Sequence, residues 1–107
     1  MKSTGLRRSQ AQEKRLAEKH GGQVSAASGA FWSRKGDVRS DRLLIEAKTT
    51  ANKSFSVTRV VMDKIEKEAI LDGRMPVLAV EIAGRNYVVI TEDDFDELLE
   101  GTWLNGG

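Results

Sequence analysis

Three side chains of complementary chemistry lie close together in Gly36-Asp37-Val38 and Ile45-Glu46-Ala47-Lys48. Successive residues of a strand point to opposite faces, so Glu46 and Lys48 share one face while Ile45 and Ala47 point to the other. A carboxylate and an amine are costly on a strand that is otherwise apolar. They must therefore pair with each other for a structural reason, or converge with Asp37 on a ligand.

A short hairpin would bring the two carboxylates together. If the strands at Val38 and at residues 43–47 are joined through the turn-like residues 39–42, Asp37 and Glu46 lie close on neighbouring strands. Two such carboxylates repel unless a cation lies between them. Oxygen ligands without His or Cys favour Mg²⁺ or Mn²⁺. A nearby lysine can hold a water and stabilise negative charge that develops on a phosphate.

Two structural alternatives stay open for these residues. Asp37 follows a glycine and could cap a turn. Glu46 and Lys48 could form an ion pair on an exposed sheet.

Length and composition indicate one small domain. The chain has 107 residues, of which 39% are hydrophobic and 31% charged, as in soluble globular proteins. We expect a single domain over residues 1–107, with flexible tails at 1–5 and 102–107. The absence of cysteine excludes a disulfide scaffold and a thiolate metal site. No apolar run approaches a membrane span, and the start lacks the hydrophobic centre of a secretory signal, so we expect a cytoplasmic protein.

The net charge of +1 conceals an asymmetry. Residues 1–62 carry 13 Lys or Arg against 5 Asp or Glu, whereas residues 63–107 carry 4 against 11. This division favours a polyanion on the basic side of the protein. Chance clustering of charges on solvated helices is the alternative.

Hydrophobic periodicity predicts the element order α-β-β-β-α-β-β-α. The expected helices cover residues 6–20, 57–71 and 92–100, and the expected strands lie at 23–27, 38, 43–47, 77–82 and 87–90. Ser54 or Ser56 is a candidate N-cap for the second helix, Gly73 ends it, and Thr91 caps the third. Residues 83–86 make a hairpin turn. The fold class is therefore α/β, with a mixed central sheet of about five strands flanked by helices.

The segment containing Asp37, Glu46 and Lys48 resembles the PD-(D/E)XK nuclease superfamily. That pattern is an aspartate near a strand start, followed on the next strand by Asp or Glu, any residue, and Lys. Here Gly36 stands where the family name has proline, and eight residues separate Asp37 from Glu46. The resemblance implies a restriction-endonuclease-like core.

Within the superfamily, the chain is most similar to archaeal and phage Holliday-junction resolvases. Arg7-Arg8, Glu13, Gly21-Gly22 and Ser28-Gly29 match the basic start, helix glutamate, glycine and serine-glycine loop of those proteins, and the match covers roughly residues 6–91. The resemblance implies a homodimeric, structure-specific endonuclease that resolves four-way DNA junctions. It would act on branched double-stranded DNA and leave 5′-phosphates.

The resemblance also implies residue roles. Asp37, Glu46 and the Ala47 carbonyl would hold Mg²⁺ or Mn²⁺. Glu13 would join them directly or through water, with Glu18 as the alternative. Lys48 would position the attacking water.

The candidate DNA contacts are basic residues, two loop aromatics and a loop serine that some resolvases place near the metal. They are Arg7, Arg8, Lys14, Arg15, Ser28, Phe31, Trp32, Arg34, Lys35, Lys53 and Arg59. Phe31 and Trp32 could instead serve packing or dimer contacts.

Two other functions stay open. One is a nicking, flap, restriction or repair nuclease of the same fold, and the other is a non-catalytic DNA-binding module. The apolar surface of the 57–71 helix, widened by Val60, Met62 and Ile70, is a candidate dimer surface.

Overall fold

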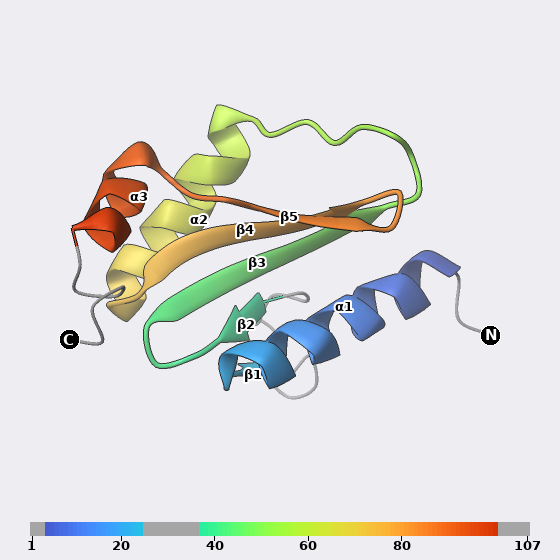
Figure 1. Ribbon diagram of the computed structural model, residues 1–107, viewed down its shortest axis with the longest axis horizontal. Coiled ribbons are helices and arrows are strands. Elements are labelled where there is room, and N and C mark those ends of the chain that lie inside the picture. Colours follow the sequence, from blue (N-terminus) through green and yellow to red (C-terminus); the bar gives the residue numbers. More distant parts are fainter. Residues whose placement is uncertain (1–3, 25–36, 101–107) are drawn as a thin grey trace.

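A computed structural model describes residues 4–24 and 37–100 of the chain. It confirms the predicted element order and the α/β class with a mixed sheet (Figure 1). The five-stranded sheet has the order β1-β2-β3-β4-β5. Only the β3–β4 pair is parallel among these strands. The elements are α1 (Thr4–His20), β1 (Gln23–Val24), β2 (Asp37–Arg39), β3 (Leu43–Thr50), α2 (Arg59–Asp72), β4 (Met75–Ile82), β5 (Arg85–Val89) and α3 (Glu92–Leu99).

The long helices lie on opposite faces of the sheet (Figure 1). On one face, Leu16 of α1 joins a buried cluster with strand residues Val38, Ile45, Ala47, Val77 and Ala79. The alternate strand residues Leu44 and Leu78 are also buried, and they face α2 with its buried Ile65 and Ala69. The central strands β3 and β4 are therefore packed on both sides, as parallel strands require.

Helix α2 is the crossover between parallel β3 and β4. Its N-cap is Thr58, whose hydroxyl accepts a hydrogen bond from the Val61 amide at 3.2 Å. The prediction of Ser54 or Ser56 as the cap was therefore wrong. Gly73 ends the helix as predicted, in the left-handed conformation with φ of 69°.

Non-local pairing explains the main differences in strand length. β3 extends to Thr50, beyond the predicted end at Ala47, because Lys48, Thr49 and Thr50 pair with β4. β4 begins at Met75 rather than at residue 77, with Pro76 near its start, where a missing N–H is tolerated. The predicted strand at 23–27 is observed at Gln23–Val24, and its remainder lies outside the described residues.

The cap of α3 is as predicted, whereas the hairpin turn is shorter than the predicted residues 83–86, because Arg85 and Asn86 pair with β4 and begin β5. Ala83 and Gly84 both have positive φ values, as a two-residue hairpin turn requires. The Thr91 hydroxyl accepts from the Asp94 amide at 3.1 Å and caps α3. No helix in the described part of the chain is both long and apolar enough to cross a bilayer.

The apolar surface of α2 is wider than the part of it that packs against the sheet. Only Ile65 and Ala69 of this helix are buried, whereas Val60 is 78% exposed and Ile70 is 74% exposed. Val60 and Ile70, two of the three residues that widen this candidate dimer surface, therefore lie largely in solvent, and Met62, the third, is half-buried.

The turn from α1 into β1 rests against β2, which carries Asp37. A Cβ atom on Gly22 would lie 2.5 Å from the main-chain oxygen of Arg39. By contrast, a Cβ on Gly21 would meet nothing within 4 Å, although its φ of +65° disfavours alanine. The two glycines therefore serve different purposes, one steric and one conformational.

We expect Gly22→Ala to lower the free energy of unfolding by about 2–3 kcal/mol, because backbone atoms must move apart. Gly21→Ala should cost about 1 kcal/mol, from its left-handed backbone alone. Urea denaturation of both variants measures the difference. An equal or smaller loss for Gly22→Ala would contradict the close approach of the turn to β2.

Candidate metal centre

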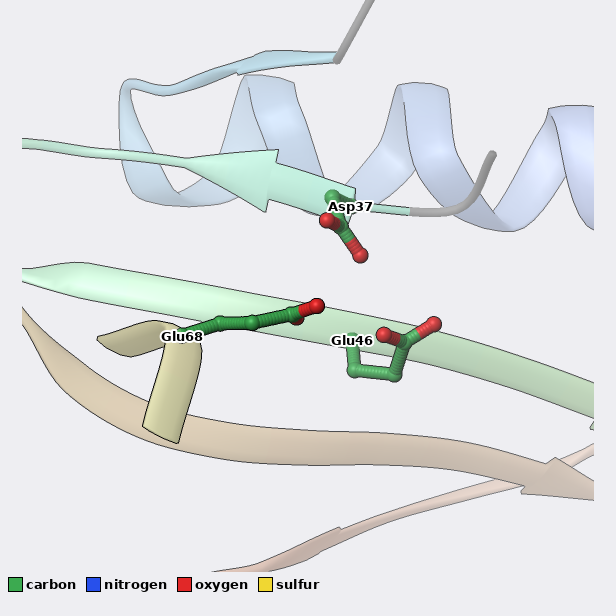
Figure 2. A group of neighbouring side chains, drawn as sticks. All are labelled: Asp37, Glu46 and Glu68. Carbon is green, nitrogen blue, oxygen red and sulfur yellow. The ribbon is translucent and has the colours of Figure 1, made fainter. Parts of the chain in front are cut away.

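Three carboxylates from three different elements converge beside the β2–β3 hairpin. Asp37 opens β2 and lies opposite Glu46 of β3 in the antiparallel register. Glu68 reaches the same point from α2, and its side chain points toward the other two (Figure 2). One ligand atom from each residue lies within 4.8 Å of the others. Asp37 and Glu46 are only 1% and 4% exposed, so the cluster lies inside the fold.

The pairing of Asp37 with Glu46 is the arrangement that the hairpin prediction requires. Asp37, Val38 and Arg39 face Glu46, Ile45 and Leu44 in order. Val38 and Ile45 therefore enter the core on the α1 face, while the two carboxylates share the α2 face.

Glu68 was missed by the sequence reasoning. It lies three residues after buried Ile65 and directly before buried Ala69, so it belongs to the sheet-facing side of α2. Helical periodicity could have placed it there. Its proximity to Glu46, however, depends on how α2 crosses the sheet.

Lys48 lies on the same face as Glu46, as strand alternation predicts. Its Nζ atom is 3.5 Å from Oε2 of Glu46. The Lys48 side chain is 41% exposed and the Glu46 side chain 6% exposed. The lysine therefore contacts a buried carboxylate while its own ammonium group remains partly exposed, so a ligand in solvent can reach that ammonium group.

The electrostatics of the cluster favour an added positive charge. Burial raises the pKa of Asp37 to about 7, and the charge of Glu46, a hydrogen bond with it, and the charge of Glu68 act in the same direction. Oδ1 of Asp37 is buried with no hydrogen-bond partner among the described residues. A proton relieves this repulsion at low pH. A divalent cation would relieve it at neutral pH, and the all-oxygen donor set fits Mg²⁺ or Mn²⁺.

The carbonyl of Ala47 is oriented suitably to join the cluster. The Lys48 carbonyl lies between β3 and β4, because the Gln12 amide reaches both it and the Ala79 carbonyl of β4. Successive carbonyls of a strand point to opposite edges, so that of Ala47 points toward the β2 side. The Ala47 carbonyl therefore lies on the β2 side of β3, one residue after Glu46.

Glu13 and Glu18 are not part of the carboxylate group that the described residues form. Both lie on α1, which packs on the opposite face of the sheet through Leu16. Glu13 is half-buried and Glu18 is exposed. The third carboxylate brought to Asp37 and Glu46 is instead that of Glu68.

The candidate DNA contacts are divided between two regions. Gln12 lies beside Lys48 and His20 lies beside Leu43, so α1 runs antiparallel to β3. Exposed Arg7 and half-buried Arg8 therefore lie toward the same end of the sheet as exposed Lys53, which follows β3.

The remaining DNA candidates differ in their contacts. Lys14 is exposed, Arg15 bonds Asn86 at 3.3 Å, and Arg59 pairs with Asp63 at 2.7 Å. Five further candidates lie outside the described residues, namely Ser28, Phe31, Trp32, Arg34 and Lys35.

Comparison of the chain with models of known protein families, with curated proteins and with solved structures finds no match.

The raised pKa of Asp37 predicts how the stability of the metal-free protein changes with pH. The folded protein holds a proton between about pH 4 and 7 that the unfolded chain has lost. Stability should therefore fall as pH rises through this range, by roughly 2–4 kcal/mol at most. The pKa of His20 is lowered by burial, so the contribution of His20 to stability rises with pH below its ordinary pKa of 6.5, opposite to that of Asp37.

Asp37→Asn isolates this contribution because His20 is unchanged in the variant. In excess EDTA the variant should be more stable than the wild type at pH 7.5 and similar to it near pH 4. Urea denaturation at both pH values tests this. A constant difference between the two proteins would show that Asp37 is not held against other carboxylates.

Glu68→Gln distinguishes the observed carboxylate from the helix α1 candidate. We expect it to weaken Mn²⁺ binding by about tenfold or more, whereas Glu13→Gln should leave binding unchanged. Titration calorimetry or electron paramagnetic resonance of Mn²⁺ measures both. The reverse order of effects would restore Glu13 as the third ligand.

Proposed function

We propose that the protein is a metal-dependent DNA endonuclease of the PD-(D/E)XK type, acting on branched DNA as a homodimer. One observation carries the proposal. Asp37, Glu46 and Glu68 converge, and Lys48 lies beside them on the same face of β3. This arrangement combines a candidate divalent-cation site with an adjacent amine, and metal-dependent phosphodiester hydrolysis uses both to stabilise negative charge and to orient the attacking water.

The residues of the chain have distinct tasks in this proposal. Asp37 and Glu46 would hold Mg²⁺, with Glu68 and the Ala47 carbonyl as further oxygen ligands. When bound, Mg²⁺ would supply Lewis-acid stabilisation of charge on the phosphodiester. Lys48 orients the attacking water and donates to phosphate oxygen, since its partly exposed ammonium extends from the buried carboxylates toward solvent.

The topology around the site supports a restriction-endonuclease-like core. An antiparallel β2–β3 hairpin carries the aspartate and the Glu-X-Lys residues, and the α2 crossover leads to parallel β4. This arrangement follows helix α1, in the same order as the sequence resemblance implies.

Nucleic acid is the substrate class favoured by charge. Arg7 and Arg8 of α1 and Lys53 lie toward the end of the sheet at which β3 terminates, whereas α3 opens with Glu92, Asp93 and Asp94. Phosphates attracted to the basic end would approach β3 near Lys48. Branched DNA and the homodimer come from the resolvase resemblance, and exposed Val60 and Ile70 are available for a contact between copies.

A non-catalytic DNA-binding module would share the basic surface. It would not need three carboxylates and a lysine beside one another. Two of these carboxylates, Asp37 and Glu46, are buried and repel each other, which a DNA-binding surface alone does not require. Another nuclease of the same fold would keep the site and differ in substrate.

Cleavage assays with four-way junction, nicked, flap and linear duplex DNA in Mg²⁺ test the proposal. We expect paired symmetric nicks in the junction, 5′-phosphate products and no cleavage in EDTA. Cleavage of nicked, flap or linear DNA in preference to the junction would reassign the substrate within the fold. Binding without cleavage of any substrate would overturn the nuclease assignment.

Asp37→Asn should lower the cleavage rate by at least about a hundredfold while leaving DNA binding intact, and Lys48→Ala should act similarly. Asp93→Asn, which removes an exposed carboxylate from α3, is the matched control and should cleave at the wild-type rate. Gel-shift assays in Ca²⁺ measure binding, and circular dichroism checks folding. Undiminished cleavage by Asp37→Asn would remove Asp37 from the mechanism.

A further inference from the structure

We infer that Gln12 is a positioning residue for the metal centre, acting through the main chain of β3 from the opposite face of the sheet. This inference rests on the proposed function. Gln12 lies on α1, on the face of the sheet opposite the three carboxylates, and has no place in the motif that contains Asp37, Glu46 and Lys48. It is nevertheless one of three buried polar or charged residues in the described chain, and the other two are Asp37 and Glu46.

The Gln12 amide bridges the two central strands. Its Nε2 atom donates to the Lys48 carbonyl at 2.7 Å and to the Ala79 carbonyl at 3.3 Å. These carbonyls belong to β3 and β4, which are parallel neighbours. One side chain of α1 therefore adds hydrogen bonds to both strands of the parallel β3–β4 ladder, at the residue that carries the candidate catalytic amine.

This contact also controls the peptide next to the carboxylates. The Lys48 carbonyl points toward β4, and the Ala47 carbonyl points toward the β2 side. A rotation of β3 at Lys48 would turn both carbonyls together. It would change where the Ala47 oxygen lies beside Glu46, and where the Lys48 side chain leaves the strand.

The energetics of Gln12 argue against a purely stabilising role. Both of its partners are acceptors, so its nitrogen must face the strands and its oxygen must face away. That oxygen, Oε1, is buried without a hydrogen-bond partner among the described residues. A buried acceptor without a partner is unfavourable for folding, and an apolar side chain would avoid that cost. The buried amide oxygen thus makes Gln12 less favourable for folding than Met or Leu at this position, which indicates that the two hydrogen bonds to the strands serve another purpose.

Gln12→Met tests the inference because it keeps the length of the side chain and removes both hydrogen bonds. Leu16→Ala is the matched control. Leu16 lies one helical turn further along α1 and is 3% exposed, so its truncation weakens the same helix packing but removes no hydrogen bond to β3. Both variants are compared with the wild type well below their melting temperatures.

We expect Gln12→Met to weaken Mn²⁺ affinity about tenfold, measured without DNA, and to slow single-turnover junction cleavage about tenfold. Its stability should change little. Leu16→Ala should lower the melting temperature and leave Mn²⁺ affinity at the wild-type value. A purely structural Gln12 would reverse this pattern, because affinity would stay unchanged while stability fell.

The two proposals fail in different ways. If the wild-type protein binds Mn²⁺ and cleaves no DNA, the nuclease assignment fails, and the affinity of Gln12→Met still reports on positioning. If the wild type cleaves and Gln12→Met matches it in Mn²⁺ affinity and rate, the positioning role fails. In that case the nuclease assignment is unaffected.

Discussion

The repulsion between Asp37 and Glu46 is the constraint on which the rest of the site depends. The β2–β3 register places them directly opposite each other, and burial removes the water that would otherwise screen them. The same register places Val38 opposite Ile45 on the other face, where both are fully buried. Burial of these apolar side chains opposes the repulsion, because it holds β2 and β3 in the register that keeps the two carboxylates opposite each other.

Much of the candidate site could be predicted from the sequence because it is local. A two-residue period fixes the shared face of Glu46 and Lys48, and a short hairpin brings Asp37 to Glu46. Gly73 and Thr91 were also predictable, because a left-handed C-cap and an N-cap hydroxyl depend on neighbouring residues alone. These features require no knowledge of how distant elements pack.

Apart from the local N-cap of α2 at Thr58, the missed features depend on packing between distant elements. β3 continues to Thr50 because β4 pairs with it, although residues 49 and 50 are polar. The placement of Glu68 beside Glu46, and of Gln12 beside Lys48, depends on how two helices cross the sheet. Glu13 is a glutamate on the expected helix, but its position on α1 places it over the other face. Composition and periodicity indicate that such residues are helical, and do not show which strand they contact.

The origin of Glu68 on the crossover helix has a consequence for how the molecule assembles. The hairpin alone can bring two carboxylates together, whereas the third arrives only when α2 docks and β3 and β4 become neighbours. Like charges oppose that final docking, and burial of Ile65 and Ala69 on adjacent turns drives it. A cation at the cluster would therefore bind the β2–β3 hairpin and helix α2 at the same time and stabilise their packing against each other. The stability of the contact between the hairpin and α2 would then depend more strongly on the cations in solution than that of any other part of the fold.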